Sequence, residues 1–168
     1  MGKMPHLTQY AKLTAFIIAT HILYMKQPAQ AQYSTQFHFP VQIYYEDTDF
    51  SGVVYHPNFL KYFERAREHV IGAETLARLW AQQGLGFAVY RSDMLCHDGI
   101  EFAEIVDVRT QFSFESKYRT VWRQEIWRPQ GKKPAVTAQI EMVCMNKARQ
   151  MAPMSAELIA ELSRHITD

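Results

Sequence analysis

Asp49 stands at a point of the chain where a carboxylate can do chemistry. The segment from Tyr44 to Arg67 reads YYEDTDFSGVVYHPNFLKYFERAR, and in it Asp49 follows an alternating apolar run and precedes His56. Burial raises the pKa of a carboxylate, whereas a nearby histidine or N–H donors lower it. Such tuning suits a general base or a nucleophile, and a positioned acid or base contributes about 10² to 10⁴ in rate.

A helix start lies a few residues further on and supplies the second part of a site. Pro57 suits the first turn of a helix, where its missing N–H has no partner to lose. The first-turn N–H groups lack partners within the helix, and the helix dipole is positive there. A carbonyl oxygen that becomes negative in a transition state is stabilised by such donors. A carboxylate opposite a helix N-terminus therefore predicts an acyl-transfer site.

Each of these residues also has a structural interpretation. Asp47 and Asp49 are then loop carboxylates that cap N–H groups, and His56 is a histidine satisfied near the helix start. Glu64 and Arg67, three residues apart, form a surface ion pair. The acidic run contains Asp-x-Asp, which is a very weak cation signal, and we expect no metal.

The elements around this segment follow from its periodicity. Alternation over residues 37–45 predicts a half-buried strand that ends with Tyr45 on its apolar side. Helical spacing from Pro57 predicts a core-packed helix, and residues 73–83 predict a short second helix. Four further strands and a final helix capped by Ser155 are expected over 87–96, 104–114, 119–128, 135–146 and 155–166. Short links imply an antiparallel meander, hence an α+β fold whose sheet curls around one long central helix.

Composition sets limits on the partners. The chain has 168 residues, 48% of them apolar, and a formal net charge of +1, which fits one packed domain and makes nucleic acid an unlikely partner. Cys96 and Cys144 show no zinc or redox spacing and are expected to be buried free thiols of a cytoplasmic protein.

Residues 1–36 read as an N-terminal extension ahead of a domain at 37–168. They carry two lysines, an apolar run from Leu13 to Met25 and the small-residue run Ala29-Gln30-Ala31. The run is too short for a membrane span but fits a signal peptide, with a mature chain beginning at Gln32. The alternative is a translation start at Met25, which makes the extension an artefact of the assigned start.

The quoted segment resembles the signature of hotdog-fold acyl-CoA thioesterases of the 4-hydroxybenzoyl-CoA thioesterase type. The resemblance is nearest to the branch associated with the Tol-Pal genes of Gram-negative bacteria, whose pattern is YYEDTD, two variable residues and GVVYH before a helix with ERAR. It implies a single hotdog domain without cofactor. It also implies hydrolysis of short-chain aliphatic or aromatic acyl-CoA, with acyl-carrier protein as a possible carrier of the thioester.

The resemblance assigns roles to particular residues. It implies that Asp49 is the catalytic carboxylate, that the backbone N–H of His56 faces the thioester oxygen while its side chain takes part, and that Tyr45 assists. The expected substrate-binding residues are Gly52, Val53, Pro57 and Asn58. A homodimer or homotetramer with sites between subunits is also implied, with Lys117, Arg119 and Arg123 as candidates for the phosphates of coenzyme A.

One stretch departs from the family pattern. Gly99-Ile100 stands where relatives usually carry Pro-Ala, and Ala103-Glu104 stands in place of an acidic pair, which affects substrate preference more than fold.

The first alternative to thioester hydrolysis is a non-catalytic domain that binds acyl thioesters or acyl-carrier protein, since fold does not fix function. The second is a hotdog dehydratase of 3-hydroxyacyl thioesters.

Overall fold

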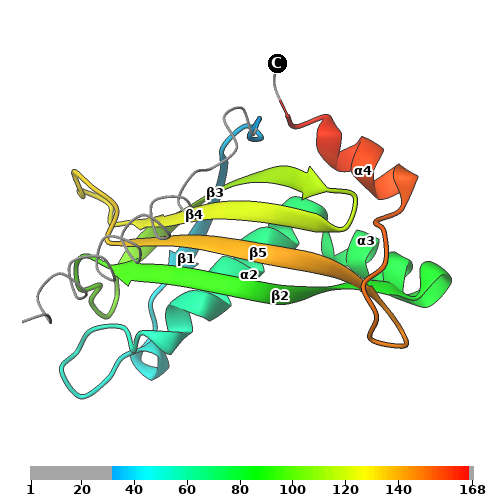
Figure 1. Ribbon diagram of the computed structural model, residues 1–168. Coiled ribbons are helices and arrows are strands. Elements are labelled where there is room, and N and C mark those ends of the chain that lie inside the picture. Colours follow the sequence, from blue (N-terminus) through cyan, green and yellow to red (C-terminus); the bar gives the residue numbers. More distant parts are fainter. Residues whose placement is uncertain (1–31, 167–168) are drawn as a thin grey trace, which may run out of the picture. The chain divides into compact units, whose positions relative to one another are not determined.

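A five-stranded antiparallel sheet forms the body of the computed structural model, which describes residues 32–166 (Figure 1). The strands lie in the order β1-β3-β4-β5-β2. Their bounds are β1 Phe37–Gln42, β2 Leu85–Cys96, β3 Ile105–Ser116, β4 Arg119–Trp127 and β5 Val136–Asn146. The helices are α2 Pro57–Ile71, α3 Ala73–Arg78 and α4 Ala156–Ser163, with a 3₁₀ turn η1 Tyr45–Asp47 and a π-helical turn η2 Leu79–Gln83.

The strand order confirms the antiparallel prediction but corrects the simple meander. β3, β4 and β5 are sequential neighbours, whereas β2 lies at the edge beside β5, and β1 occupies the opposite edge beside β3. The link of residues 97–104 therefore passes from one side of the sheet to the interior strand β3. It crosses the ends of β5 and β4, where the N–H groups of His97 and Asp98 donate to the carbonyl of Ala135.

Helix α2 is the long helix that the sheet covers, as its periodicity predicts (Figure 1). It begins at Pro57, and its apolar face buries Phe59, Phe63 and Ala66. Inward-facing residues of the strands complete the same core, among them Val106, Val108, Phe112, Trp122, Ile126 and Ile140. This burial supplies most of the stabilisation at about 25 cal/mol per Å² of apolar surface. Its consequence for function is a fixed position for the start of α2.

Glu64 and Arg67 of α2 were expected to pair on the surface, and this prediction is wrong for Arg67. Arg67 is only 2% exposed, because it lies four residues after Phe63 on the face that packs against the sheet. Its Nη1 donates to Oε1 of Gln124 at 2.7 Å, and its Nη2 pairs with the exposed Glu64. Gln124 in turn donates to the carbonyl of Phe63 and to the hydroxyl of Thr110, both at 3.0 Å. Burial lowers the pKa of Arg67.

Several predicted elements end differently in the structure. β1 stops at Gln42, so Tyr45 lies in the turn η1 with 82% of its surface exposed, not on the apolar side of a strand. The expected helix over 73–83 is split into α3 and the π-helical turn, and Gly84 then takes the left-handed conformation. Ser155 caps α4 as predicted, through a hydrogen bond from the N–H of Leu158. Cys144 is buried as expected, but Cys96 is exposed.

The predictions for the N-terminal extension lie largely outside the described residues. Both the signal-like run and the alternative start at Met25 fall before residue 32, so they stay predictions. Within residues 32–166, no helix is both long and apolar enough to cross a membrane.

Candidate active site

The acidic segment folds into a small hairpin, residues 47–56, which directly precedes α2 in the chain. Thr48 and Val54 form an isolated antiparallel bridge, and the N–H of Asp49 donates to the carbonyl of Val53 at 2.9 Å. The turn closes with the N–H of Gly52 on the carbonyl of Asp49 at 3.0 Å. Gly52 has a φ of +84°, which a residue with a side chain rarely adopts. Asp49 therefore sits at the first corner of a tight turn, two residues after the end of η1.

Ser51 holds the carboxylate of Asp49. Its N–H donates to Oδ1 of Asp49 at 2.8 Å, and its hydroxyl donates to the same oxygen. These two bonds lower the pKa of Asp49, the hydroxyl bond contributing most. The carboxylate is consequently ionised at neutral pH, which is the form that a nucleophile or a general base needs.

His56 carries the backbone donor that stays open at the helix start. Pro57 has no N–H, and the N–H groups of Tyr55, Asn58 and Phe59 donate to the carbonyls of Asp47, Tyr55 and His56. Within residues 32–166, the N–H of His56 has no hydrogen-bond partner. Of the backbone N–H groups expected to face a substrate oxygen at the helix start, the N–H of His56 is thus the one that is free to do so in the described part of the chain. The imidazole of His56 is exposed and makes an edge contact with the ring of Tyr55, at 5.0 Å between centroids.

The other predicted site residues divide into two groups. Tyr45 and Gly52 are exposed, and the ring of Tyr45 meets Phe102 edge-on at 6.3 Å. Val53 and Pro57 are half-buried. Asn58 is 7% exposed, and its Nδ2 donates to the carbonyl of Asp47 at 2.9 Å, which anchors the hairpin to α2.

The stretch that departs from the family pattern lies directly against the hairpin. The N–H of Val54 donates to the carbonyl of Ile100 at 2.8 Å, and a Cβ placed on Gly99 would come within 3.1 Å of Cγ1 of Val53. Arg128 at the end of β4 clamps this stretch. It forms a two-pronged ion pair with Glu104, which raises its pKa, and its Nη1 donates to the carbonyl of Gly99 at 3.1 Å.

The three cations proposed for coenzyme A have different surroundings. Arg119 already lies between Glu115 at 3.1 Å and Glu141 at 3.3 Å, so its charge is compensated. Lys117 and Arg123 lie over the rings of Tyr118 and Tyr33 at 5.2 Å and 3.9 Å. The role of these three residues in binding the phosphates of coenzyme A stays a prediction.

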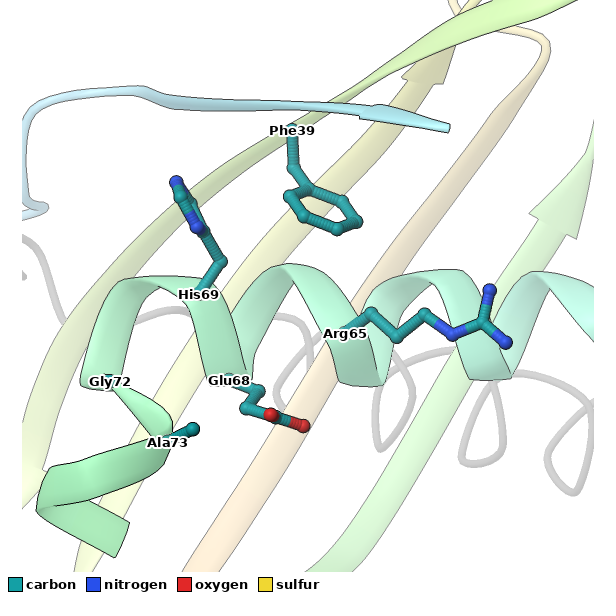
Figure 2. A pocket seen from close by; sticks show the side chains of 6 residues that line it. All are labelled: Phe39, Arg65, Glu68, His69, Gly72 and Ala73. Atoms are coloured by element: carbon teal, nitrogen blue, oxygen red, sulfur yellow. The ribbon is translucent and has the colours of Figure 1, made fainter. Parts of the chain in front are cut away.

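A cavity of about 350 Å³ lies elsewhere on the molecule, along the second half of α2 (Figure 2). Its lining comes from β1 and α2 and ends at the connection to α3, with Phe39 and His69 facing each other at 5.3 Å between ring centroids. Arg65 and Glu68 give it charges of both signs. The cavity is thus separate from the turn that carries Asp49.

The Asp-x-Asp of the acidic run is the weak cation signal of this sequence. In the part of the chain that the structure describes, no three histidine, cysteine, aspartate or glutamate side chains converge as a metal site would require. The expectation of chemistry without a metal stays a prediction.

Comparison with known proteins places this geometry in a family. Residues 44–162 match the model of the thioesterase-like superfamily. An acyl-CoA thioesterase, YbgC, of Haemophilus influenzae is 30% identical over 118 residues, which are 69% of this chain and 87% of the relative. The chain therefore belongs to the thioesterase-like superfamily, and it is a thioester hydrolase.

Solved structures of the same fold agree with this assignment. Slr0204, a 1,4-dihydroxy-2-naphthoyl-CoA thioesterase from Synechocystis, matches with a TM-score of 0.69 at 22% identity, over 76% of this chain and 94% of that one. A probable thioesterase from Bartonella henselae matches with a TM-score of 0.66 at 26% identity, over 72% and 100% of the two chains. The predicted single hotdog domain, a curved sheet around a central helix, is confirmed.

Proposed function

We propose that the protein hydrolyses short-chain aliphatic or aromatic acyl-CoA to the free acid and coenzyme A. One observation carries the proposal: the ionised carboxylate of Asp49 and the open N–H of His56 belong to the same hairpin, whose arms the bridge of Thr48 and Val54 joins. The carboxylate activates the attacking group, and the N–H of His56 donates a hydrogen bond to the thioester oxygen on which negative charge develops.

The reaction balances with water as the only other reactant. Asp49 takes a proton from water, which adds to the thioester carbon, or attacks that carbon itself to give a mixed anhydride that water then opens. In both routes the C–S bond breaks, the thiolate of coenzyme A leaves with the electron pair and takes up one proton of the water, and the acyl group leaves as a carboxylate while the other proton passes to solvent and Asp49 is ionised again. Both routes need Asp49 ionised, which its two bonds from Ser51 favour.

We propose that a second copy of the chain binds to the surface around the hairpin. Large apolar side chains are exposed there, including Phe50, whose ring projects fully into solvent, and Tyr45, Tyr55 and Phe102. Contiguous apolar surface of this kind marks an interface. We therefore propose a homodimer, or a homotetramer built from it, in the cytoplasm, and sedimentation velocity measures the mass directly.

Replacing one carboxylate tests the proposed reaction. Asp49→Asn removes the ionised oxygen and keeps the shape, so release of free thiol from a panel of acyl-CoA substrates should fall by at least about 10². Glu74→Gln, an exposed carboxylate in the first turn of α3, is the matched control and should keep full activity. Full activity of the Asp49 variant overturns the mechanism.

The same panel separates the alternatives. Binding of acyl-CoA by the unaltered protein without thiol release would favour the non-catalytic binding domain. Loss of water from a 3-hydroxyacyl thioester would favour the dehydratase. Thioesters of acyl-carrier protein belong in the panel, because nothing at the hairpin selects between the two carriers.

A further inference from the structure

Asp47 joins three parts of the chain at the base of the hairpin. Its carboxylate accepts the N–H of Tyr44 at 2.9 Å, which ties it to the residues that leave β1. Its carbonyl accepts the N–H of Tyr55 and the Nδ2 of Asn58, each at 2.9 Å. A carbonyl oxygen has two lone pairs, so both are used. The position of the hairpin thus depends on how firmly Asp47 is held.

Tyr62 approaches the same residue from α2. It lies four residues after Asn58, so both side chains come from one face of the helix. Tyr62 is 1% exposed, and within residues 32–166 its hydroxyl has no partner at hydrogen-bonding geometry. Burial, and next to it the neighbouring carboxylate of Asp47, raises the pKa of Tyr62 far above its ordinary value. The hydroxyl therefore keeps its proton and can donate.

A buried hydroxyl without a partner destabilises the folded state. The ring alone would pack equally well, since Tyr62 lies edge-on to Phe59 at 6.2 Å in the apolar core. One turn earlier on the same helix Asn58 already contacts Asp47, and the carboxylate of Asp47 acts electrostatically on the hydroxyl of Tyr62. A small movement of the hairpin toward α2 would close this contact, as catalytic hydrogen bonds often tighten only when substrate is bound.

We infer that Tyr62 is a positioning residue: its hydroxyl donates to the carboxylate of Asp47 and locks the hairpin that carries Asp49 and the N–H of His56. Asn58 and Tyr62 then form a two-point clamp on Asp47, one on the carbonyl and one on the carboxylate. The inference rests on the proposed thioesterase function for its kinetic consequence, but the clamp itself is a statement about the hairpin.

Removing one oxygen atom tests the clamp. Tyr62→Phe keeps the packed ring, so kcat for acyl-CoA hydrolysis should fall about tenfold, with KM within about twofold, as expected for a hydrogen bond to a charged acceptor. Tyr118→Phe, in the turn between β3 and β4, is the matched control and should change neither constant. An unchanged kcat overturns the inference, and so does a rise in KM alone, which would make the hydroxyl a group that binds substrate.

Two further measurements distinguish positioning from general stability. Amide hydrogen exchange should become faster at Tyr44 and Tyr55, whose N–H groups bind Asp47, and stay unchanged at the core of β4. In a double-mutant cycle, Tyr62→Phe should add little to the kcat loss of Asp47→Ala, because both changes remove the same hydrogen bond. Additive losses, or unchanged exchange, overturn the clamp. A protein that releases no thiol at all would refute the proposed function, while the exchange result would still decide the clamp.

Discussion

The start of α2 and its middle hold polar groups in different ways. At the start, Asp49 and His56 belong to a hairpin that solvent reaches, and the carboxylate is held by donors two residues away. Further along the helix, Arg67 is buried and donates a hydrogen bond to the buried Gln124 of β4. These two residues are 57 apart in the sequence. The same helix thus connects a locally determined site to a polar cluster that only the complete sheet creates.

This difference implies that the exposed hairpin determines activity, whereas the buried cluster around Arg67 determines stability. Local hydrogen bonds at an exposed turn contribute little to folding, so the residues there can be chosen for chemistry. A buried guanidinium needs its partners, because an unpaired buried charge is strongly destabilising. Changes at Phe63, Arg67 and Gln124 should therefore alter unfolding, and changes in the hairpin should alter the reaction.

The largest expected effect on folding comes from the apolar core beside Arg67. Phe63 is fully buried, so Phe63→Ala should lower the free energy of unfolding by about 3–5 kcal/mol. Leu60, on the same helix but 41% exposed, is the control, and Leu60→Ala should cost less than about 1.5 kcal/mol. Urea denaturation measures both, and equal losses would contradict the burial of this face.

A smaller loss is expected from the buried amide. Gln124→Met keeps the volume but removes the acceptor of Arg67, so the free energy of unfolding should fall by about 3 kcal/mol. Activity per folded molecule should change little, because Gln124 does not contact the hairpin. Gln130→Met, in the exposed connection after β4, should stay within about 0.5 kcal/mol.

The partner variant sharpens this result. Adding Arg67→Met to Gln124→Met should recover part of the loss, because removing both members of a buried pair costs less than removing one. A double variant that loses the sum of the two single losses would show that the pair is not coupled.

Much of the fold was predictable from local patterns. Alternation and short links predict the antiparallel pairing of β3, β4 and β5, and Pro57 marks the start of α2. The place of β2 beside β5 was not predictable, because a link of the length of 97–104 reaches either edge of the sheet. The burial of Arg67 had a signal, because it follows Phe63 by four residues on the core face, although a charged side chain ordinarily favours the surface.

The candidate site was predictable in part. The spacing of Asp49 and Ser51 is typical of a turn in which a carboxylate accepts an N–H two residues on, a signal that could have identified Ser51. The open N–H of His56 had no sequence signal, because it depends on the carbonyls that its neighbours happen to meet. The contact of Asn58 with Asp47 likewise depends on how the hairpin packs on α2.

The smallest expected effect concerns the pH dependence of the reaction. Ser51→Ala removes the hydroxyl that contributes most to the lowered pKa of Asp49 and leaves the N–H bond in place. The pKa of Asp49 should rise toward its ordinary value, so the acid limb of the kcat/KM profile should move to higher pH while the rate at neutral pH changes little. Because a carboxylate with a lowered pKa stabilises the folded state above its ordinary pKa and loses that contribution in acid, the variant should be slightly less stable than the unaltered protein near neutral pH, and this difference should vanish in acid. Ser163→Ala, exposed at the end of α4, should leave the acid limb in place, and an unmoved limb in Ser51→Ala would show that Asp49 is not the group whose ionisation the reaction follows.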